Sequence, residues 1–495
     1  MAATEKVVVT KLKTDDSVEL SHTDLPASLE EIDPKIEARI RRKYDLRIMP
    51  IVTLIYLMAF IDRSNMGNAR VLGMEDELEL TGVRFNLALT AFFITYVLFE
   101  VPTNILCKKF GPRIWLSLIT CAFGLLTMCI GFCTSFGGIT AARAILGVAE
   151  AGIMPGISYM LSTFYRRYEL VTRVGLYASF ASLAGGFGGL LATGLHMIPP
   201  WGMMHTWRNI FFFEGILTMI TGVICYIFLP KSPETASFLT PEERHVGALR
   251  IQLEVLTHNQ TKLHKQHFKL AIMNLHTILM SIGLFCSLLC MNSIALFMPS
   301  LLATMGYDSI QSQLMTVPPY AVGTVVCIVL CILSDYYRTR GVIIGGVVAV
   351  LITVAFIILL AVPMEMTGVR YMAIFFATAG AFTGSPMQIG WLVENAAGPM
   401  VRAIASATGV SIGSLGGLLA TWTYLKTEAP EYTVGHAINL AAGVIVMCVA
   451  ITATINLRWK NRQRSLGKKD YMLDGLTKEE IDELGHSHPN FRFTP

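Results

Sequence analysis

The sequence predicts an all-α membrane protein with twelve transmembrane helices, arranged as two six-helix bundles. Its 495 residues are 53% hydrophobic and only 15% charged, whereas about a quarter of the residues in a soluble chain are charged. The chain also contains apolar runs of roughly 20 residues, the length that a helix needs to cross the hydrocarbon core of a bilayer. A polar segment, residues 230–275, divides these runs into two sets of six. We therefore expect a linker that joins two bundles.

The predicted spans define the organisation of the chain. In order, they cover residues 49–69, 86–106, 113–133, 138–160, 173–196, 208–229, 276–301, 314–334, 342–362, 370–391, 403–425 and 434–457. The division that follows is a tail (1–48), a first bundle (49–229), the linker (230–275), a second bundle (276–458) and a second tail (459–495).

Basic residues gather on one side of the predicted membrane. They precede the first span and follow the second, fourth and last spans, as in Arg41, Arg42, Lys108, Lys109, Arg166, Arg167, Arg458 and Arg462. An excess of Lys and Arg marks cytosolic loops. We therefore expect both tails and the linker of this multi-pass protein to be cytosolic. The expected location is the plasma membrane.

A short internal repeat supports the division into two halves. The fifth predicted span contains Gly-Gly-Leu-Leu-Ala-Thr at 188–193, and the eleventh contains the same six residues at 416–421, an offset of 228. Two related halves of six helices, side by side in the membrane, are a known plan of transporters.

The fourth span contains two charged residues, which indicates a function or a specific pairing, because a charge at mid-bilayer costs roughly 3 kcal/mol or more. Arg143 and Glu150 lie seven residues apart, so they return to nearly the same helix face, with Gly147 between them. They are about 10 Å apart along the axis. This gap can hold a small carboxylate ligand against Arg143, with Glu150 able to bind a proton. The alternative is that both charges pair with polar groups on neighbouring helices.

A second charged pair, Asp62-Arg63, lies in the first span and is followed by Asn65. Adjacent helical residues point about 100° apart, so one of the two charges can face a central cavity while the other pairs sideways. The planar fork of an arginine suits a carboxylate. Arg63 could instead extend to the outer headgroups. The offset of 228 maps both charged pairs onto uncharged residues of the second half, so we expect the ionic chemistry in the first bundle.

Other residues are weaker candidates. Tyr96 can reach a cavity with its hydroxyl group, while Trp391 and Asn395 end the tenth span and can close a pocket. Glu100 and Glu214 are unusual within spans, but each can be satisfied near an interface. The cysteines lie mostly in apolar runs and are read as buried apolar residues. We expect no metal, cofactor or nucleic acid, and no enzymatic activity.

Longer motifs then carry a family resemblance. They are Ile61–Ala69 (IDRSNMGNA), Arg143–Gly156 (RAILGVAEAGIMPG), Leu229–Thr235 (LPKSPET), Phe238–Arg244 (FLTPEER) and Leu484–Phe493 (LGHSHPNFRF). Across nearly the whole chain, the sequence resembles the major facilitator superfamily, within it the anion:cation symporter family and its fungal allantoate permease branch.

The resemblance implies roles for the charged residues. Arg63 and Arg143 match arginines that contact a substrate anion, and Asp62 and Glu150 match carboxylates tied to proton coupling. Asn65 is a further candidate for substrate binding. The resemblance also implies a cytosolic gate. Asp335 and Arg338 keep that pattern in the second half, whereas Cys107 replaces the acid in the first half.

The expected function is proton-coupled uptake of a small organic anion by alternating access, by a protein that is monomeric in the bilayer. Nicotinate, allantoate, pantothenate, biotin, other small carboxylates and short peptides are all open as substrates. One alternative is an efflux antiporter of a metabolite or drug, although residues 173–196 lack the proline common in the fifth span of such antiporters. The other alternative is a nutrient-sensing receptor.

Overall fold

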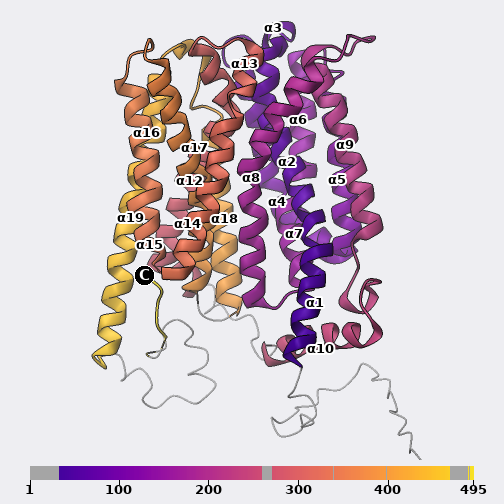
Figure 1. Cartoon of the computed structure of the whole chain (residues 1–495), viewed down its shortest axis with the longest axis vertical. Coiled ribbons are helices and arrows are strands. Elements are labelled where there is room, and N and C mark those ends of the chain that lie inside the picture. Colours follow the sequence, from indigo (N-terminus) through magenta and orange to yellow (C-terminus); the bar gives the residue numbers. More distant parts are fainter. Residues whose placement is uncertain (1–32, 259–269, 338, 397–398, 469–488, 490) are drawn as a thin grey trace, which may run out of the picture.

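Two bundles of long helices stand side by side in the computed structural model (Figure 1). The structure describes residues 33–258, 270–337, 339–396, 399–468, 489 and 491–495. The first bundle consists of α2 (Met49–Ala69), α4 (Arg84–Phe110), α5 (Pro112–Ile130), α6 (Phe136–Glu150), α7 (Ile153–Ser162), α8 (Arg167–His196) and α9 (Thr206–Phe228). The second consists of α12 (Leu275–Thr304), α14 (Val317–Tyr337), α15 (Arg340–Ile343), α16 (Ala349–Ala361), α17 (Thr367–Glu394), α18 (Pro399–Ala420) and α19 (Thr433–Ser465).

These helices confirm the predicted all-α plan of twelve spans in two bundles. Within the described residues, ten helical stretches are long and apolar enough to cross a membrane, and α17 and α18 take the tenth and eleventh predicted positions. Short segments complete the first bundle and its loops: η2 (Arg70–Met74), α3 (Glu75–Glu77) and η3 (Pro233–Thr235). In the second half they are α13 (Ser309–Leu314), η4 (Ile344–Val348) and η5 (Lys426–Glu428).

The predicted fourth span differs from a single helix, since α6 ends at Glu150 and α7 begins at Ile153. The break coincides with a close approach to neighbouring helices. A Cβ atom added at Gly152 would lie 3.0 Å from Cβ of Thr103 and 3.2 Å from Nε1 of Trp115. The glycine therefore lets α4 and α5 pack directly against the turn, and the turn places Glu150 at the end of α6.

Two helices that the span prediction does not contain lie together at one end of the molecule. α1 (Pro34–Arg47) precedes the first span, and α10 (Pro241–His258) lies within the linker. Both are drawn at the bottom of Figure 1. We refer to this end as the α10 end and to the other as the opposite end. Asp33 and Pro34 start α1, because the Asp33 side chain accepts a hydrogen bond from the Lys35 N–H group.

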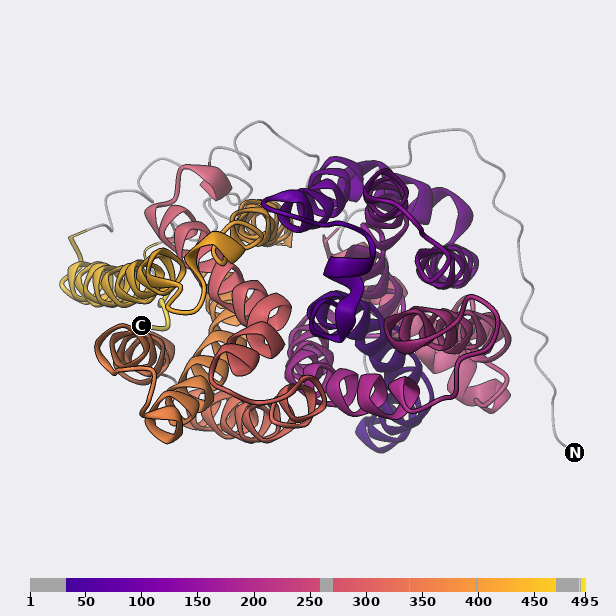
Figure 2. The same cartoon turned by 90° about the horizontal axis from the view of Figure 1, so that it is seen from above.

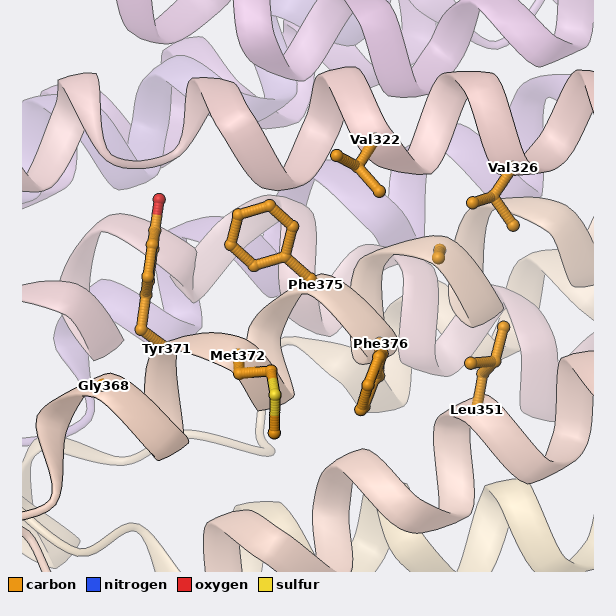
Figure 3. Close-up of a pocket in the computed structure, with 9 residues that line it drawn as sticks. Val322, Val326, Leu351, Gly368, Tyr371, Met372, Phe375 and Phe376 are labelled. Carbon is orange, nitrogen blue, oxygen red and sulfur yellow. The ribbon is translucent and has the colours of Figure 1, made fainter.

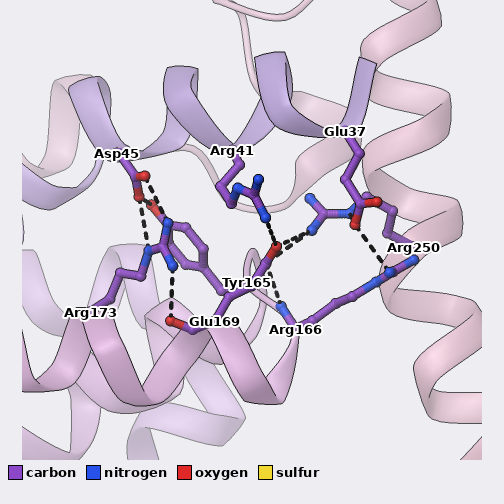
Figure 4. A network of polar contacts seen from close by, with 8 residues as sticks. All are labelled: Glu37, Arg41, Asp45, Tyr165, Arg166, Glu169, Arg173 and Arg250. Atoms are coloured by element: carbon purple, nitrogen blue, oxygen red, sulfur yellow. Dashed lines mark hydrogen bonds and ion pairs between the residues drawn. The ribbon is translucent and has the colours of Figure 1, made fainter. Parts of the chain in front are cut away.

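A network of ion pairs with a buried centre fastens α1 and α10 to the first turn of α8 (Figure 4). Arg250 of α10 donates to both carboxylate oxygens of Glu169, at 2.7 and 2.9 Å, and to Glu37 of α1 at 2.9 Å. The side chains of Arg250 and Glu169 are 0% and 1% exposed. Nearby, Arg173 pairs with Asp45 at 2.8 Å. Burial, followed by the charge of Asp45, raises the pKa of Tyr165, which stays neutral and donates to Asp45.

We expect Arg250→Ala to lower the stability of the purified protein by about 3 kcal/mol, because the buried Glu169 then keeps only the longer ion pair with the partly exposed Arg41. The midpoint of thermal unfolding in detergent measures this loss. Arg42→Ala, on an exposed position of α1, is the matched control and should leave the midpoint nearly unchanged. Equal midpoints for the two variants would show that the network does not stabilise the fold.

Candidate functional site

An ion pair between α2 and α6 forms the centre of the candidate site. Nη2 of Arg63 lies 2.6 Å from Oε1 of Glu150, and its Nε donates to the same oxygen at 2.8 Å. The Glu150 side chain is 1% exposed and that of Arg63 is 14% exposed. One carboxylate oxygen thus takes two N–H groups of the guanidinium fork, which is a strong, charge-assisted arrangement.

Aromatic rings surround the Arg63 guanidinium group. Its central carbon lies 4.9 Å from the ring centre of Tyr96, and 5.5 to 5.9 Å from those of Phe60, Phe92 and Phe93. Cations are attracted to the faces of aromatic rings at such distances. The rings therefore stabilise the charge of Arg63 within the membrane-spanning region while leaving its planar fork directed at Glu150.

The second pair, Asp62 and Arg143, lies inside the first bundle. Nη1 of Arg143 is 2.9 Å from Oδ2 of Asp62, and the Thr127 hydroxyl group donates to Oδ1 at 3.0 Å. Asp62 and Arg143 are 0% and 1% exposed. The prediction that Asp62 and Arg63 point to different neighbours is confirmed, since Asp62 faces α5 and α6 while Arg63 lines a cavity.

The space between Arg143 and Glu150 is filled in this structure. A Cβ atom added at Gly147 would meet the carbonyl oxygen of Phe92 and the hydroxyl oxygen of Thr95, both on α4. The sequence-based expectation of a ligand gap beside Gly147 therefore does not describe this conformation, because α4 occupies the gap. Arg143 and Glu150 instead take separate partners on α2.

A cavity of about 70 Å³ lies between the bundles and contains Arg63. The first bundle contributes Tyr56, Phe60, Arg63, Phe93, Tyr96, Met154, Ala178 and Ala181. The second contributes Leu284, Leu288, Met291, Asn292, Ser385, Pro386, Ile389, Val410 and Ser414. Arg63 is the one charged residue in this lining. Of the other predicted substrate residues, Tyr96 lines the cavity, whereas Asn65, Arg143, Trp391 and Asn395 are not part of its wall.

Trp391 and Asn395 hold the last described residues of the chain. Nε1 of Trp391 donates to the carbonyl oxygen of Thr494 at 2.8 Å. The Asn395 side chain donates to that oxygen at 3.0 Å and accepts from the Thr494 N–H group at 2.9 Å. Asn461 of α19 makes the same pair of contacts with Phe493, at 2.8 and 3.0 Å. These two asparagines thus connect the α10 ends of α17 and α19 through the residues that lie between them.

The predicted gate of the second half contains an additional partner. Asp335 accepts from Arg340 at 2.7 Å, and Arg340 also donates to Glu394 of α17 at 2.6 Å. Arg338, the other predicted gate residue, lies outside the described residues. The described part of the gate therefore joins α14, α15 and α17 through Arg340.

At the opposite end, the two copies of the internal repeat each reach across to the other bundle. The Thr193 hydroxyl group lies 3.2 Å from Oε1 of Gln313 on α13, and the Thr421 hydroxyl group lies 2.9 Å from that of Thr90 on α4. Between these contacts, Gly67 of α2 packs against the carbonyl oxygen of Leu296 on α12. Lys426 adds an ion pair to Glu75 at 3.1 Å. The bundles are thus fastened to each other at this end, which Figure 2 shows from above.

A second hollow lies away from the charged cluster, among α14, α16 and α17 (Figure 3). None of the residues that line it is charged: they are Val322, Val326, Leu351, Gly368, Tyr371, Met372, Phe375, Phe376 and Ala379. This lining offers no guanidinium or ammonium group to an anion, so the cavity that contains Arg63 is the stronger candidate.

The sequence analysis gave too little weight to Glu214 and did not identify the group of aromatic side chains that surrounds Arg63. Glu214 of α9 accepts a hydrogen bond from Asn65 at 2.8 Å and is 0% exposed, so it belongs to the central cluster. The position of Glu214 within an apolar span is the one sequence feature that points to this cluster, but the sequence does not show which helices surround α9. Among the described residues, no group of three or more His, Cys, Asp or Glu side chains is placed to hold a metal.

Comparisons with known proteins show the family of this chain. The model of the Major Facilitator Superfamily matches residues 52–421. Uncharacterized transporter C1039.04 of Schizosaccharomyces pombe is 32% identical over 95% of this chain and 92% of its own length. The major facilitator-type transporter hxnP of Emericella nidulans is 30% identical over 93% and 94%, respectively.

Solved structures show the same fold. A bacterial homolog of the human lysosomal transporter Spinster, in an inward-facing and unoccupied conformation, superposes with a TM-score of 0.62 over 86% of this chain and 97% of that chain, at 15% identity. The xylose transporter XylE of E. coli gives 0.61 over 81% and 97%, at 14% identity.

Proposed function

This chain belongs to the Major Facilitator Superfamily and is a transporter rather than an enzyme; we propose that it takes up a small organic anion together with protons. One observation carries the proposal. Arg63 is the one charge in the wall of the cavity between the bundles, and in this structure it is paired with Glu150. A substrate carboxylate and the Glu150 carboxylate therefore compete for the same guanidinium group.

This competition links the anion to the proton. When Glu150 binds a proton, it loses its charge and the attraction to Arg63 weakens, so the guanidinium fork becomes available to an anion. One proton and one monovalent anion then leave the site with no net change in charge. Arg143 and Asp62, which pair inside the bundle, are proposed to support this centre rather than to touch the substrate in the conformation described here.

The lining and the volume of the cavity also indicate what kind of anion it can hold. Aromatic rings line its first-bundle side, and apolar residues with Asn292, Ser385 and Ser414 line the other side. Its volume of about 70 Å³ is well below the roughly 300–1,000 Å³ of sites for drug-sized molecules. A small carboxylate with a flat, partly apolar body fits these walls best.

The contacts at the opposite end and the arginines at the α10 end support a proposed orientation of the protein in the membrane. We propose that the α10 end faces the cytosol, since Arg41, Arg166 and Arg250 gather there. The contacts at the opposite end then make this conformation closed to the outside. Alternating access follows from rocking the two bundles about the cavity. The proposed location is the plasma membrane, with the protein acting as a monomer.

Uptake by purified protein in lipid vesicles tests the proposal. Labelled nicotinate, allantoate, pantothenate and biotin are supplied outside, with and without an acidic outer pH, and at least one should accumulate only with the pH step. For that anion, we expect Glu150→Gln to abolish accumulation but to keep exchange of internal for external anion, because Arg63 is then free at every pH.

Glu100→Gln is the matched control, since it replaces another glutamate within a span that is not in the cavity wall. It should accumulate the anion as the wild type does. If Glu150→Gln still concentrates the anion in response to the pH step, Glu150 is not the coupling group.

A further inference from the structure

A third carboxyl group lies buried in the first bundle, and the mechanism above does not use it. Glu214 of α9 is 0% exposed. Its Oε2 accepts a hydrogen bond from the Asn65 side chain at 2.8 Å, and Asn65 in turn accepts one from Asn68 at 2.9 Å. Oε1 is buried and has no hydrogen-bond partner among the described residues. The bonded partner of Glu214 is therefore an uncharged amide.

The charges around Glu214 do not balance if every acid is ionised. The acids that act on it are Asp62 of α2 and Glu150 of α6, and the base is Arg143 of α6. Together with Arg63, the cluster holds three carboxyl groups and two guanidinium groups. Each guanidinium group is already bonded to one carboxylate, Arg63 to Glu150 and Arg143 to Asp62. Glu214 is left without a cation of its own.

Burying an isolated carboxylate is costly enough that such a group usually takes up a proton. Two neighbouring negative charges add to the cost, and the Asn65 amide offers one hydrogen bond in return. We propose that Glu214 is a second proton-binding site of this protein and holds a proton, as a neutral carboxylic acid, in the conformation closed at the opposite end. The proton is assigned to Oε1, the oxygen that accepts no hydrogen bond.

Arg143 gives this site a way to act on its surroundings. Its Nε and Nη2 groups are buried and have no hydrogen-bond partner among the described residues, so the guanidinium group has donors to spare. Once Glu214 releases its proton, the new carboxylate competes with Asp62 for Arg143. This repeats, deeper in the bundle, the competition at Arg63. The proposed use of the second site in transport rests on the proposed function, whereas its protonation does not.

Infrared spectroscopy of the purified protein in lipid tests the site without any substrate. A protonated carboxylic acid has a carbonyl stretching band that a carboxylate lacks. At pH 7, the wild type minus Glu214→Gln difference spectrum should contain this band, and the band should disappear as the pH is raised. Glu242→Gln, on an exposed position of α10, is the matched control, and its difference spectrum should lack the band. Glu150→Gln should keep the Glu214 band.

Thermal unfolding separates a lost proton site from a misfolded variant. Glutamine resembles a neutral glutamic acid in shape and charge, so Glu214→Gln should unfold within a few degrees of the wild type at pH 7. The proposal is overturned if the difference spectrum lacks the band, or if the band persists unchanged at every pH at which the protein stays folded. Failure of every anion to accumulate would remove the proposed function but leave this result standing.

Discussion

Arg63→Ala is expected to abolish concentrative uptake of the anion. The substitution removes the one charge in the cavity wall and leaves Glu150, 1% exposed, without its partner. Hydrogen bonds to a charged group contribute about 1.5–3 kcal/mol, and each 1.4 kcal/mol is a factor of ten in affinity. Uptake at low anion concentration should therefore fall by roughly 10- to 100-fold or more. Labelled uptake into vesicles measures it.

Two further variants separate recognition from folding. Arg63→Lys keeps the charge but loses the planar fork, so uptake should fall less than in Arg63→Ala but should not be normal. The double variant Arg63→Ala/Glu150→Ala removes both charges, so its thermal stability should recover towards the wild type while uptake stays absent. Uptake by Arg63→Ala within twofold of the wild type would contradict the role of Arg63.

Gly67→Ala is expected to open the end at which the bundles meet. A Cβ atom at this position would overlap the Leu296 carbonyl oxygen of α12, a backbone atom that cannot move aside without shifting the helix. Overpacking of this kind costs about 1–3 kcal/mol, which shifts a two-state equilibrium by roughly 5- to 150-fold. The variant should populate the conformation open at the opposite end and should transport more slowly.

The rate at which a thiol reagent labels a cysteine introduced at Asn292, in the cavity wall, measures this shift. A membrane-impermeant reagent added on the side of the opposite end should react faster in the Gly67→Ala background. Gly346→Ala is the matched control, because nothing lies within 4 Å of a Cβ added there. Equal labelling rates in the two backgrounds would show that the contact at Gly67 does not control closure.

The spans could be predicted from the sequence because bilayer thickness fixes their length. The first predicted span, 49–69, has the bounds of α2. α10 was not predicted, because it is polar and lies outside the membrane-spanning runs. Its stability comes from contacts such as Arg250 with Glu37 and Glu169, and these three residues are far apart in the sequence.

The charged residues of the site could be found from the sequence, but their pairing could not. Helical geometry indicated that Asp62 and Arg63 point apart, and the structure confirms it. The partners depend on which helices are neighbours, so Arg143 and Glu150, on one helix face, bond to different residues of α2. Trp391 and Asn395 were predicted near a pocket, yet they hold Thr494, a contact across about 100 residues that helix periodicity does not encode.

The two copies of Gly-Gly-Leu-Leu-Ala-Thr bear on how the two halves of the molecule are related. Thr193 and Thr421, one from each half, each contact the other bundle, although their partners, Gln313 and Thr90, are not related by the offset of 228. An ancestor assembled from two identical halves would have placed this threonine on both sides of the contact between them. The repeat therefore marks surfaces on which the halves meet, while the central ion pairs lie in the first half. The two halves thus share a fold and a contact surface, but the central charged residues belong to the first half.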